Sequence, residues 1–497
     1  MSTNMFGVPV EGFSQKSKEA AAEGIVLLKN EGGMLPLTQE DKISVFGRPQ
    51  IEYYRSGTGS GGAVNVEYAT NIIDGFKSSN LSINEELVTD YVNWIKDHPF
   101  DNGGGGWACE PWFQKDMPID EAFAKEQAAK TNKALYIIGR TAGEDKDNAI
   151  WQGSYILTDE EKENIRNITK AFDNVCIVLN VSNIIDLSWI NNEEYNGSIK
   201  SVIIVWQGGM EGGTAVVDVL SGAETPSGKL ADTIAYSIED YPSTKNFGNE
   251  FKNLYEEDIY IGYRYFETFA PDKVQFEFGY GLSYTTFDIE TQTVKEKTDS
   301  IELNVKVTNT GDKFAGKEVV QIYIHDVVST VMTPVKQLKG FKKIELQPGE
   351  EKLVQLKVPV HELYLTSNFG DRYLEPGKFE IQVGTSSDEI YYKLPVWVGN
   401  KPISLEENSL SKAPVITTGK IIRIEGIVRD VQATPIAGVK VKTINSEEEV
   451  MTDAKGSYSL PAHSGDILLF SKKGYASQKV RASGQHKINI QMMKENF

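Results

Sequence analysis

Three carboxylates lie together in one short stretch of the sequence, at Glu144, Asp145 and Asp147. They follow the apolar run ALYIIG (134–139), which has the composition of a buried strand. In an open parallel sheet, the loops beyond the carboxyl ends of strands hold charged groups in a crevice. A carboxylate in such a crevice is suited to proton transfer. Glu144 is therefore the first candidate for a catalytic residue, and an ordinary solvated loop acid is the alternative.

A glycine-rich loop, RSGTGSGG (55–62), follows a second apolar run, KISVFG (42–47). Its glycines permit tight turns and a close approach of the backbone to a ligand. Such a loop could present Arg55 or Ser60 to a bound ligand, which makes both candidates for substrate binding. A purely structural turn fits equally well, and the loop lacks the lysine that a phosphate-binding P-loop requires.

Three tryptophans flank glycines and acids instead of apolar runs: Trp107, Trp112 and Trp151. An indole ring is large and rigid and stacks well on the apolar face of a sugar. Trp107 and Trp151 are taken as candidate substrate-binding residues, with core packing as the alternative. Glu211, in the sequence GGMEGG, is expected to interact with a helix amino terminus, with substrate contact as its alternative.

The elements that must position these residues are indicated by near-continuous apolar runs, which are typical of strands covered by helices on both faces. These runs cover residues 42–47, 134–139, 175–181 and 201–206. Two intervening segments, 14–30 and 158–172, have helical patterns, with Ser14 as a possible cap and Thr158 and Glu161 as a capping box. The pattern predicts a doubly wound α/β domain over residues 1–241.

The second half of the chain is predicted to be all-β. Residues 242–290 are aromatic and irregular and are expected to form a connector. From Ile301 the apolar residues alternate with polar ones, which indicates an antiparallel sandwich over residues 291–400. A polar, proline-containing linker is expected over 401–419, followed by a small domain of short strands over 420–497.

The composition of the chain restricts the classes of function that the protein can have. A chain of 497 residues exceeds what one hydrophobic core usually organises, and a net charge of −19 argues against binding to nucleic acid or to anionic lipid. The two cysteines, Cys109 and Cys176, make no disulfide framework and lack metal-ligand spacing, so neither a metal nor a cofactor is expected. The first residues lack the pattern of a signal peptide, and no apolar run is long enough to span a membrane, so we expect the cytoplasm.

Four ordered blocks of the sequence together resemble glycoside hydrolase family 3. They are EAAAEGIVLLKNEGGMLPL (19–37), the segment 43–66, WQGGMEGGTAVVDVLSGAETPSGKLADTI (206–234) and GYRYFETFAPDKVQFEFGYGLSYTTF (262–287). Members of that family are mostly β-glucosidases and β-xylosidases built from a (β/α)8 barrel, a six-stranded α/β sandwich and a fibronectin type III-like domain. The resemblance implies the last two of these domains. The stretches DAKGSYSL and KKGYASQKV resemble a transthyretin-like carboxypeptidase regulatory-like domain, a non-catalytic module usual in secreted or outer-membrane proteins, which conflicts with the expected cytoplasmic location.

The resemblance also bears on mechanism. The chain begins like a rearranged subgroup in which the barrel follows the fibronectin-like domain, but only about 95 residues remain there, against roughly 250 in a barrel. The barrel is therefore expected to be absent. In the family the nucleophile is an aspartate of the barrel, and the acid/base is a glutamate in a motif resembling GEDKD (143–147), which implies the acid/base role for Glu144. The commoner motif has GEG followed by Asp-Arg, so Asp145 and Lys146 depart from it.

Two functions follow as expectations. The first is a β-glucosidase-like component that acts on a β-linked oligosaccharide or aryl glycoside, with the nucleophile supplied by a barrel-domain partner chain. The second is a carbohydrate-binding or structural module that has lost catalysis. The sequence does not separate them.

Overall fold

The computed structural model describes residues 10–494 with short gaps. The gaps are residues 63, 196, 250, 253, 328, 330, 367–371, 399–403, 406–420, 431–432, 444–448, 464–466, 482–487 and 493. Most of the predicted linker, 401–419, thus lies outside the described residues. In the described parts, no helix has the length and apolar character needed to cross a membrane.

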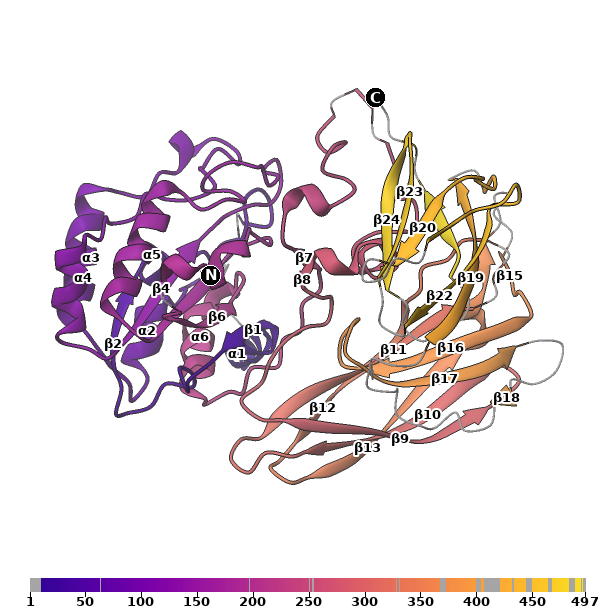
Figure 1. Ribbon diagram of the computed structural model, residues 1–497. Coiled ribbons are helices and arrows are strands. Elements are labelled where there is room, and N and C mark those ends of the chain that lie inside the picture. Colours follow the sequence, from indigo (N-terminus) through magenta and orange to yellow (C-terminus); the bar gives the residue numbers. More distant parts are fainter. Residues whose placement is uncertain are drawn as a thin grey trace, which may run out of the picture.

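The amino-terminal part is a six-stranded sheet with helices on both faces (Figure 1). Its strands lie in the order β1-β6-β5-β4-β2-β3, and every pair is parallel except β1 with β6. The strands are β1 (Val26–Asn30), β2 (Lys42–Phe46), β3 (Ser82–Ile83), β4 (Lys133–Gly139), β5 (Val175–Asn180) and β6 (Ile199–Ile204). The predicted α/β sheet with buried strands is confirmed.

Alternate residues of β4 enter two different cores. Tyr136 and Ile138 pack with α3 (Glu85–Asp97), α4 (Glu121–Ala128) and α5 (Asp159–Ala171). Leu135 and Ile137 pack with the other helices on the opposite face. Those helices are α1 (Phe13–Gly24), α2 (Ile72–Lys77) and α6 (Gly212–Ser221). A strand buried on both faces has no room for polar alternation, which explains the continuous apolar runs.

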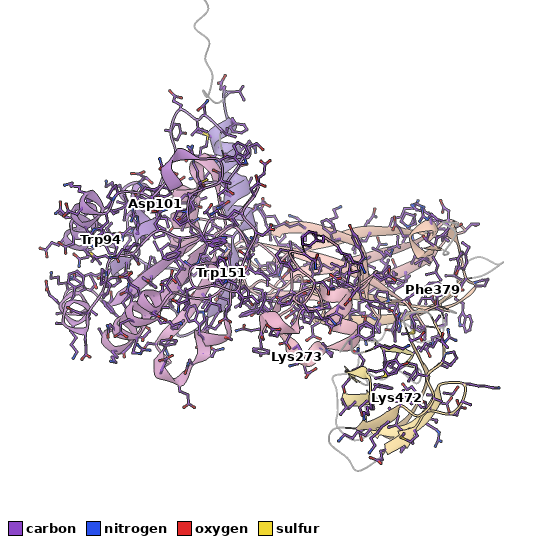
Figure 2. The ribbon with its side chains drawn as sticks, turned by 90° about the horizontal axis from the view of Figure 1, so that it is seen from above. Trp94, Asp101, Trp151, Lys273, Phe379 and Lys472 are labelled. Carbon is purple, nitrogen blue, oxygen red and sulfur yellow. The ribbon has the colours of Figure 1, made fainter. Side chains whose placement is uncertain are left out.

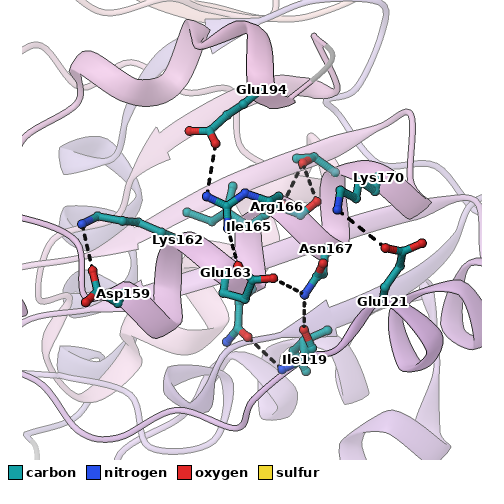
Figure 3. Close-up of polar contacts among 12 residues, drawn as sticks. Ile119, Glu121, Asp159, Lys162, Glu163, Ile165, Arg166, Asn167, Lys170 and Glu194 are labelled. Carbon is teal, nitrogen blue, oxygen red and sulfur yellow. Dashed lines mark hydrogen bonds and ion pairs between the residues drawn. The ribbon is translucent and has the colours of Figure 1, made fainter.

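Helix α5 begins with the predicted capping box. The Thr158 side chain accepts from the Glu161 N–H at 3.1 Å, and the Glu161 carboxylate accepts from the Thr158 N–H at 2.8 Å. Along the helix, Asn167 donates to the Ile119 carbonyl, and Arg166 bridges Glu163 and Glu194 (Figure 3). These contacts fix the helix that follows the Glu144 loop.

The prediction of one helix over residues 14–30 is wrong in its second half. Helix α1 ends at Gly24, and Val26–Asn30 forms β1 against β6. Burial decides this, since Val26 and Leu27 are fully enclosed and the edge of the sheet supplies their backbone partners. The amino-terminal cap is Gly12 in the left-handed conformation, not Ser14.

The segment that follows the α/β sheet forms a long excursion whose two ends pair with each other. Strand β7 (Ile234–Ala235) pairs with β8 (Val274–Phe276), and the intervening residues include α7 (Tyr263–Phe269). The next strand, β9, begins at Phe287, inside the range expected for the connector.

Two antiparallel sheets follow and enclose one core, as the alternation predicts. One sheet contains β9 (Phe287–Glu296), β10 (Ser300–Asn309) and β13 (Glu351–Pro359). The other contains β11 (Gly316–Asp326), β12 (Gln337–Leu346), β16 (Gly377–Gly384), β17 (Ile390–Val398) and β18 (Ser404–Leu405). A short pair, β14 (Leu365–Thr366) and β15 (Arg372–Tyr373), lies beside them. Strand β18 falls within the range expected for the linker.

The carboxyl-terminal residues form a separate small β unit with its own core, in yellow in Figure 1. One sheet joins β19 (Ile421–Asp430), β22 (Ser457–His463) and β25 (Ile490–Met492), with β19 and β25 parallel. The other joins β20 (Lys440–Thr443), β21 (Glu449–Met451), β23 (Ile467–Lys472) and β24 (Tyr475–Arg481). Figure 2 shows Lys472 in this unit and Phe379 in the preceding sandwich.

Ion pairs join the α/β domain to the first sandwich. The Glu23 carboxylate at the end of α1 meets Lys317 of β11 at 2.5 Å and Lys343 of β12 at 3.1 Å. Lys229 pairs with Glu318 at 2.8 Å, where both side chains are mostly buried. The sandwich is thus fixed against the face of the sheet that α1 covers.

Candidate active site

The sheet changes the direction of its winding between β2 and β4. From β2 the chain continues outward to β3, and from β4 it continues to β5 and β6 on the other side. Loops that follow the carboxyl ends of two such strands diverge and leave a crevice. The glycine-rich loop after β2 and the Glu144 loop after β4 meet at this point.

Ser60 and Glu144 make the direct contact between the two loops. The backbone N–H of Ser60 donates to Oε2 of Glu144 at 2.9 Å, and the Ser60 hydroxyl donates to the same oxygen at 2.8 Å. Oε1 of Glu144 accepts no hydrogen bond from any described residue. The fold therefore fixes one carboxylate oxygen and leaves the other without a hydrogen-bond partner among the described residues.

The backbone supports this contact. Thr58 donates its N–H to the Ala142 carbonyl at 2.9 Å and its hydroxyl to the Glu144 carbonyl at 3.1 Å. Gly59 has a φ of +78°, and a Cβ added there would lie 2.4 Å from Cβ of Glu144. Only glycine allows the two loops to approach this closely. The glycines of residues 57–62 thus allow the contact between Ser60 and Glu144. This role differs from that of an unconstrained loop and from that of a phosphate-binding loop.

The hydrogen bonds from Ser60 stabilise the charged form of Glu144. They lower the pKa of its carboxyl below the ordinary value, the backbone N–H having the larger effect and the hydroxyl the smaller. The side chain is fully exposed, so burial offers little opposition. Glu144 is therefore ionised at neutral pH in this structure.

Aromatic side chains surround the acidic loop. Trp107, 55% exposed, donates its indole N–H to the Asp145 carboxylate at 3.1 Å. Trp112 donates to the Asp147 carbonyl at 3.0 Å, and the Lys146 amino group lies 4.9 Å from the centre of its ring. These contacts exclude core packing for Trp107 and bring it to the acidic loop.

Trp151 lies at the far end of the same loop. Its ring meets that of Trp112 edge to face, with the centroids 5.4 Å apart, and its side chain is 64% exposed. Two of the three tryptophans therefore offer open faces beside the carboxylates, a geometry that suits stacking on sugar rings.

Arg55 and Glu211 have structural partners. The Arg55 carbonyl accepts from the Gly209 N–H at 2.9 Å, and its half-buried guanidinium approaches the Val64 carbonyl at 3.4 Å. Glu211 occupies the position before α6, as expected, but its side chain caps no backbone N–H. It accepts from the hydroxyls of Tyr68 and Thr214, so the carboxylate lies at the helix terminus as expected but is held there by side-chain hydrogen bonds.

Sequence reasoning missed Thr58 and Lys146 as parts of the site. Their only signal was position, Thr58 within a glycine run and Lys146 within an acidic one. Both cysteines are free, Cys109 exposed and Cys176 buried. Within the described ranges, no cluster of three or more His, Cys, Asp or Glu side chains could hold a metal ion.

Comparisons with known proteins agree with this fold. Residues 25–284 match the glycosyl hydrolase family 3 C-terminal domain, and residues 318–387 match a fibronectin type III-like domain. A β-glucosidase of Ruminococcus albus is 47% identical over 347 residues, covering 70% of this chain and 36% of its own length. β-Glucosidase A of Butyrivibrio fibrisolvens is 35% identical over 418 residues, covering 74% of this chain and 49% of its own length.

Solved structures show the same likeness. A β-glucosidase from Paenibacillus barengoltzii superposes with a TM-score of 0.77 and 46% identity, covering 93% of this chain and 49% of that one. β-Glucosidase 3B from Thermotoga neapolitana, in complex with α-D-glucose, gives a TM-score of 0.72 at 34% identity, covering 80% of this chain and 55% of that one. The chain belongs to glycoside hydrolase family 3. It spans half or less of the length of the two curated relatives described above.

Proposed function

We propose that this chain supplies the acid/base half of a retaining β-glucosidase site, with Glu144 as the acid/base. The observation that supports this most directly is the Ser60–Glu144 contact, which fixes one carboxylate oxygen and leaves the other free. An acid/base needs such an oriented oxygen to protonate the leaving group and later to activate water. The names of the relatives support a terminal β-glucosidic bond as the target, in a β-linked oligosaccharide or aryl glycoside.

The second carboxylate of the mechanism is proposed to come from a (β/α)8 barrel outside this sequence, in a partner chain or in a longer form of the protein. In retaining glycosidases the two carboxyl groups lie about 5 to 5.5 Å apart, with the nucleophile facing the acid/base. Asp145, next to Glu144 in the same loop, has one carboxylate oxygen hydrogen-bonded by the Trp107 indole. The relatives extend well beyond the matched part, which leaves room for such a domain.

The barrel also has to change the ionisation of Glu144. A general acid must carry its proton near neutral pH, whereas the hydrogen bonds from Ser60 hold the Glu144 pKa low in the exposed loop. A covering domain would remove water from the carboxyl and place an ionised aspartate near it, and both effects raise the pKa. The exposed faces of Trp107 and Trp151 would then line the sugar site together with Ser60 and Arg55.

The finer parts of the architecture are proposals of the same kind. We place an α/β domain at 1–241, a connector at 242–290, the fibronectin type III-like domain at 291–400, a linker at 401–419 and a carboxypeptidase regulatory-like domain of transthyretin type at 420–497. Two facing sheets with a core of their own support the last assignment. Two free thiols support a reducing compartment such as the cytoplasm.

Reconstitution tests the function. Hydrolysis of 4-nitrophenyl β-D-glucoside is measured for the chain alone, for a separately expressed family 3 barrel and for the mixture. We expect turnover only in the mixture, and its loss with Glu144→Gln but not with the neighbouring Asp147→Asn. Robust turnover by the chain alone that Glu144→Gln abolishes would show that the chain holds its own nucleophile. A mixture that gains no activity would favour the alternative, a non-catalytic carbohydrate-binding or structural module.

A further inference from the structure

A second concave site lies on the α/β domain, apart from the residues assigned to the Glu144 site. It is a groove of about 670 Å³ between the segment 98–115 and the start of α5. Ligand clefts in proteins commonly measure about 300–1,000 Å³. In Figure 2, Asp101 of the groove lies near Trp94, toward the end of the α/β domain remote from the β-sandwiches, whereas Trp151 lies closer to them. Neither Glu144, Ser60 nor Trp107 lines the groove.

The lining combines hydrogen-bond acceptors, donors and ring surfaces. Asp101, Asp159 and Glu160 supply carboxylates, Lys115 and His98 supply donors, and Phe113, Pro99 and Pro111 supply apolar surface. The carboxylates oppose an anionic ligand, and the apolar surface suits the apolar faces of sugar rings. A neutral ligand with many hydroxyl groups can satisfy both the donors and the acceptors.

Glu160 is the polar group left open in the wall. Its carboxylate accepts no hydrogen bond from the described residues, and partial burial raises its pKa above the ordinary value. The positive charge of Lys115, which also lines the groove, acts in the opposite direction. A hydroxyl placed between Glu160 and Lys115 would donate to the first and accept from the second.

The walls are held in place before any ligand arrives. Asp101 and Gln114 exchange two hydrogen bonds, from the Asp101 N–H at 2.7 Å and to the Asp101 carbonyl at 2.9 Å. The guanidinium of Arg48, only 3% exposed, donates to the carbonyls of His98 and Lys115 at 2.8 and 3.0 Å. A preorganised site loses less entropy when a ligand binds.

Beneath the groove lies a recess of about 20 Å³ that shares Arg48 and Gln114 with it. That volume suits about one water molecule. Tyr54 lines the recess, and its hydroxyl is buried without a hydrogen-bond partner among the described residues. The charges that act on this hydroxyl are those of Arg140, Arg48, Glu52 and Glu110, of which Arg48 and Glu52 also line the recess. The recess therefore offers a buried polar group that a bridging water would connect to a ligand in the groove.

From this geometry we propose that the groove between residues 98–115 and the start of α5 binds a neutral oligosaccharide. The segment 98–115 has the groove on one side and carries Trp107 and Trp112 toward the acidic loop on the other. A saccharide bound here would hold a carbohydrate chain against the protein without occupying the Glu144 site. The proposal does not depend on catalysis by Glu144.

Calorimetric titration of the full chain with cellotetraose tests the proposal. Lys115→Ala and Glu160→Ala should each raise the Kd about three- to ten-fold, the effect of losing one or two hydrogen bonds. Two matched controls on the exposed face of α4, Lys125→Ala and Glu126→Ala, should leave it unchanged. Glu144→Gln should also leave it unchanged, so failure of the proposed function and failure of this site give different results. Thermal unfolding of each variant checks that it is folded.

Hydrogen exchange locates the binding independently of any substitution. Cellotetraose should slow amide exchange in residues 98–115 and at the start of α5. Binding that persists in both groove variants but disappears with Trp107→Ala would place the sugar at the acidic loop and overturn the proposal. Absence of binding by cellotetraose, or binding of inorganic phosphate in its place, would also overturn it.

Discussion

Arg140 and Glu161 form a buried pair beneath the loop that carries Glu144. The two terminal nitrogens of the Arg140 guanidinium, Nη1 and Nη2, donate to the two carboxylate oxygens of Glu161, at 2.6 Å each. Arg140 follows directly after β4, and Glu161 lies in the first turn of α5. The pair therefore closes the loop at its base, where the chain leaves the sheet and where it enters the helix.

Glu161→Gln should be strongly destabilising. The substitution leaves the Arg140 charge buried without its counter-charge, which typically lowers the free energy of unfolding by about 3–5 kcal/mol. Glutamine can make the same capping hydrogen bonds as glutamate, so the loss of stability measures the effect of removing the Glu161 charge. Denaturant unfolding measures it, and Glu121→Gln in the exposed pair with Lys125 is the control, which should lose far less stability because solvent screens that pair. Equal losses would contradict the role given to the buried pair.

Ser60→Ala should raise the pKa of Glu144. Hydrogen bonds to a carboxylate favour its charged form, so removing the hydroxyl moves the pKa upward toward the ordinary value. The backbone N–H of residue 60 remains, so the shift should be partial. Carboxyl NMR titration measures it. Ser56→Ala in the same loop is the control, and an equal shift there would show that the loop as a whole, not Ser60, sets the pKa.

Gly59→Ala should disturb the contact between the two loops, whereas Gly61→Ala should not. A side chain at 59 requires a left-handed backbone and collides with Glu144, while a Cβ at 61 meets nothing within 4 Å. The strained backbone alone costs about 1–3 kcal/mol. Amide chemical shifts of Thr58, Gly143 and Glu144 follow the local change, and thermal unfolding follows the global one. Similar spectra for both variants would contradict the close approach.

His325 should make the protein less stable in mild acid. Burial, assisted by Lys393 and Lys336, lowers the pKa of its imidazole to about 4. Because the folded pKa lies below the unfolded value of about 6.5, the unfolded state takes up the proton first. The free energy of unfolding should therefore fall by up to about 3 kcal/mol between pH 7 and pH 4.

Burial also raises the pKa of Asp116 to about 7, and this shift changes the free energy of unfolding with the opposite sign over the same pH range. Comparing the wild type with a His325 variant therefore isolates the contribution of His325. His325→Gln should remove the contribution of His325 from the pH dependence of unfolding, measured by urea titration at several pH values. His361→Gln, at an exposed histidine, should leave the dependence as it is. If the free energy of unfolding of the His325 variant depended on pH as steeply as that of the wild type, the role given to His325 would be refuted.

In the reconstituted pair, Glu144→Ala should affect substrates unequally. A poor leaving group needs its proton from the acid, whereas an activated aryl group hardly does. We expect turnover of cellobiose to fall by two or more orders of magnitude further than that of 2,4-dinitrophenyl β-D-glucoside. Steady-state kinetics on both substrates measures the ratio. Equal losses would leave Glu144 an ordinary loop carboxylate.

Much of the α/β domain could be predicted because its signals are local. The continuous apolar run at 134–139 and the Thr158–Glu161 capping box each determine their element within a few residues. Strand β1 could not be found this way. It follows α1 after one residue, and only its antiparallel pairing with β6, about 175 residues later, makes it a strand.

The candidate site was predictable as a list of residues but not as an arrangement. Glu144 and Ser60 could be named from residue type and loop position, yet the hydrogen bonds between them depend on which strands are neighbours in the sheet. The low pKa of Glu144 follows from those bonds, so it could not be inferred either. Glu211 shows the reverse case, since its position before α6 was expected while one of its hydroxyl partners, Tyr68, comes from a tertiary contact.

Strand β1 has a consequence for how the connector is held. Leu27 of β1 accepts a hydrogen bond from the Leu282 N–H at 2.9 Å, so the first strand of the sheet touches the carboxyl-terminal part of the connector. The connector therefore begins and ends against the α/β domain, and the contacts at its two ends offset the entropy of closing that long loop.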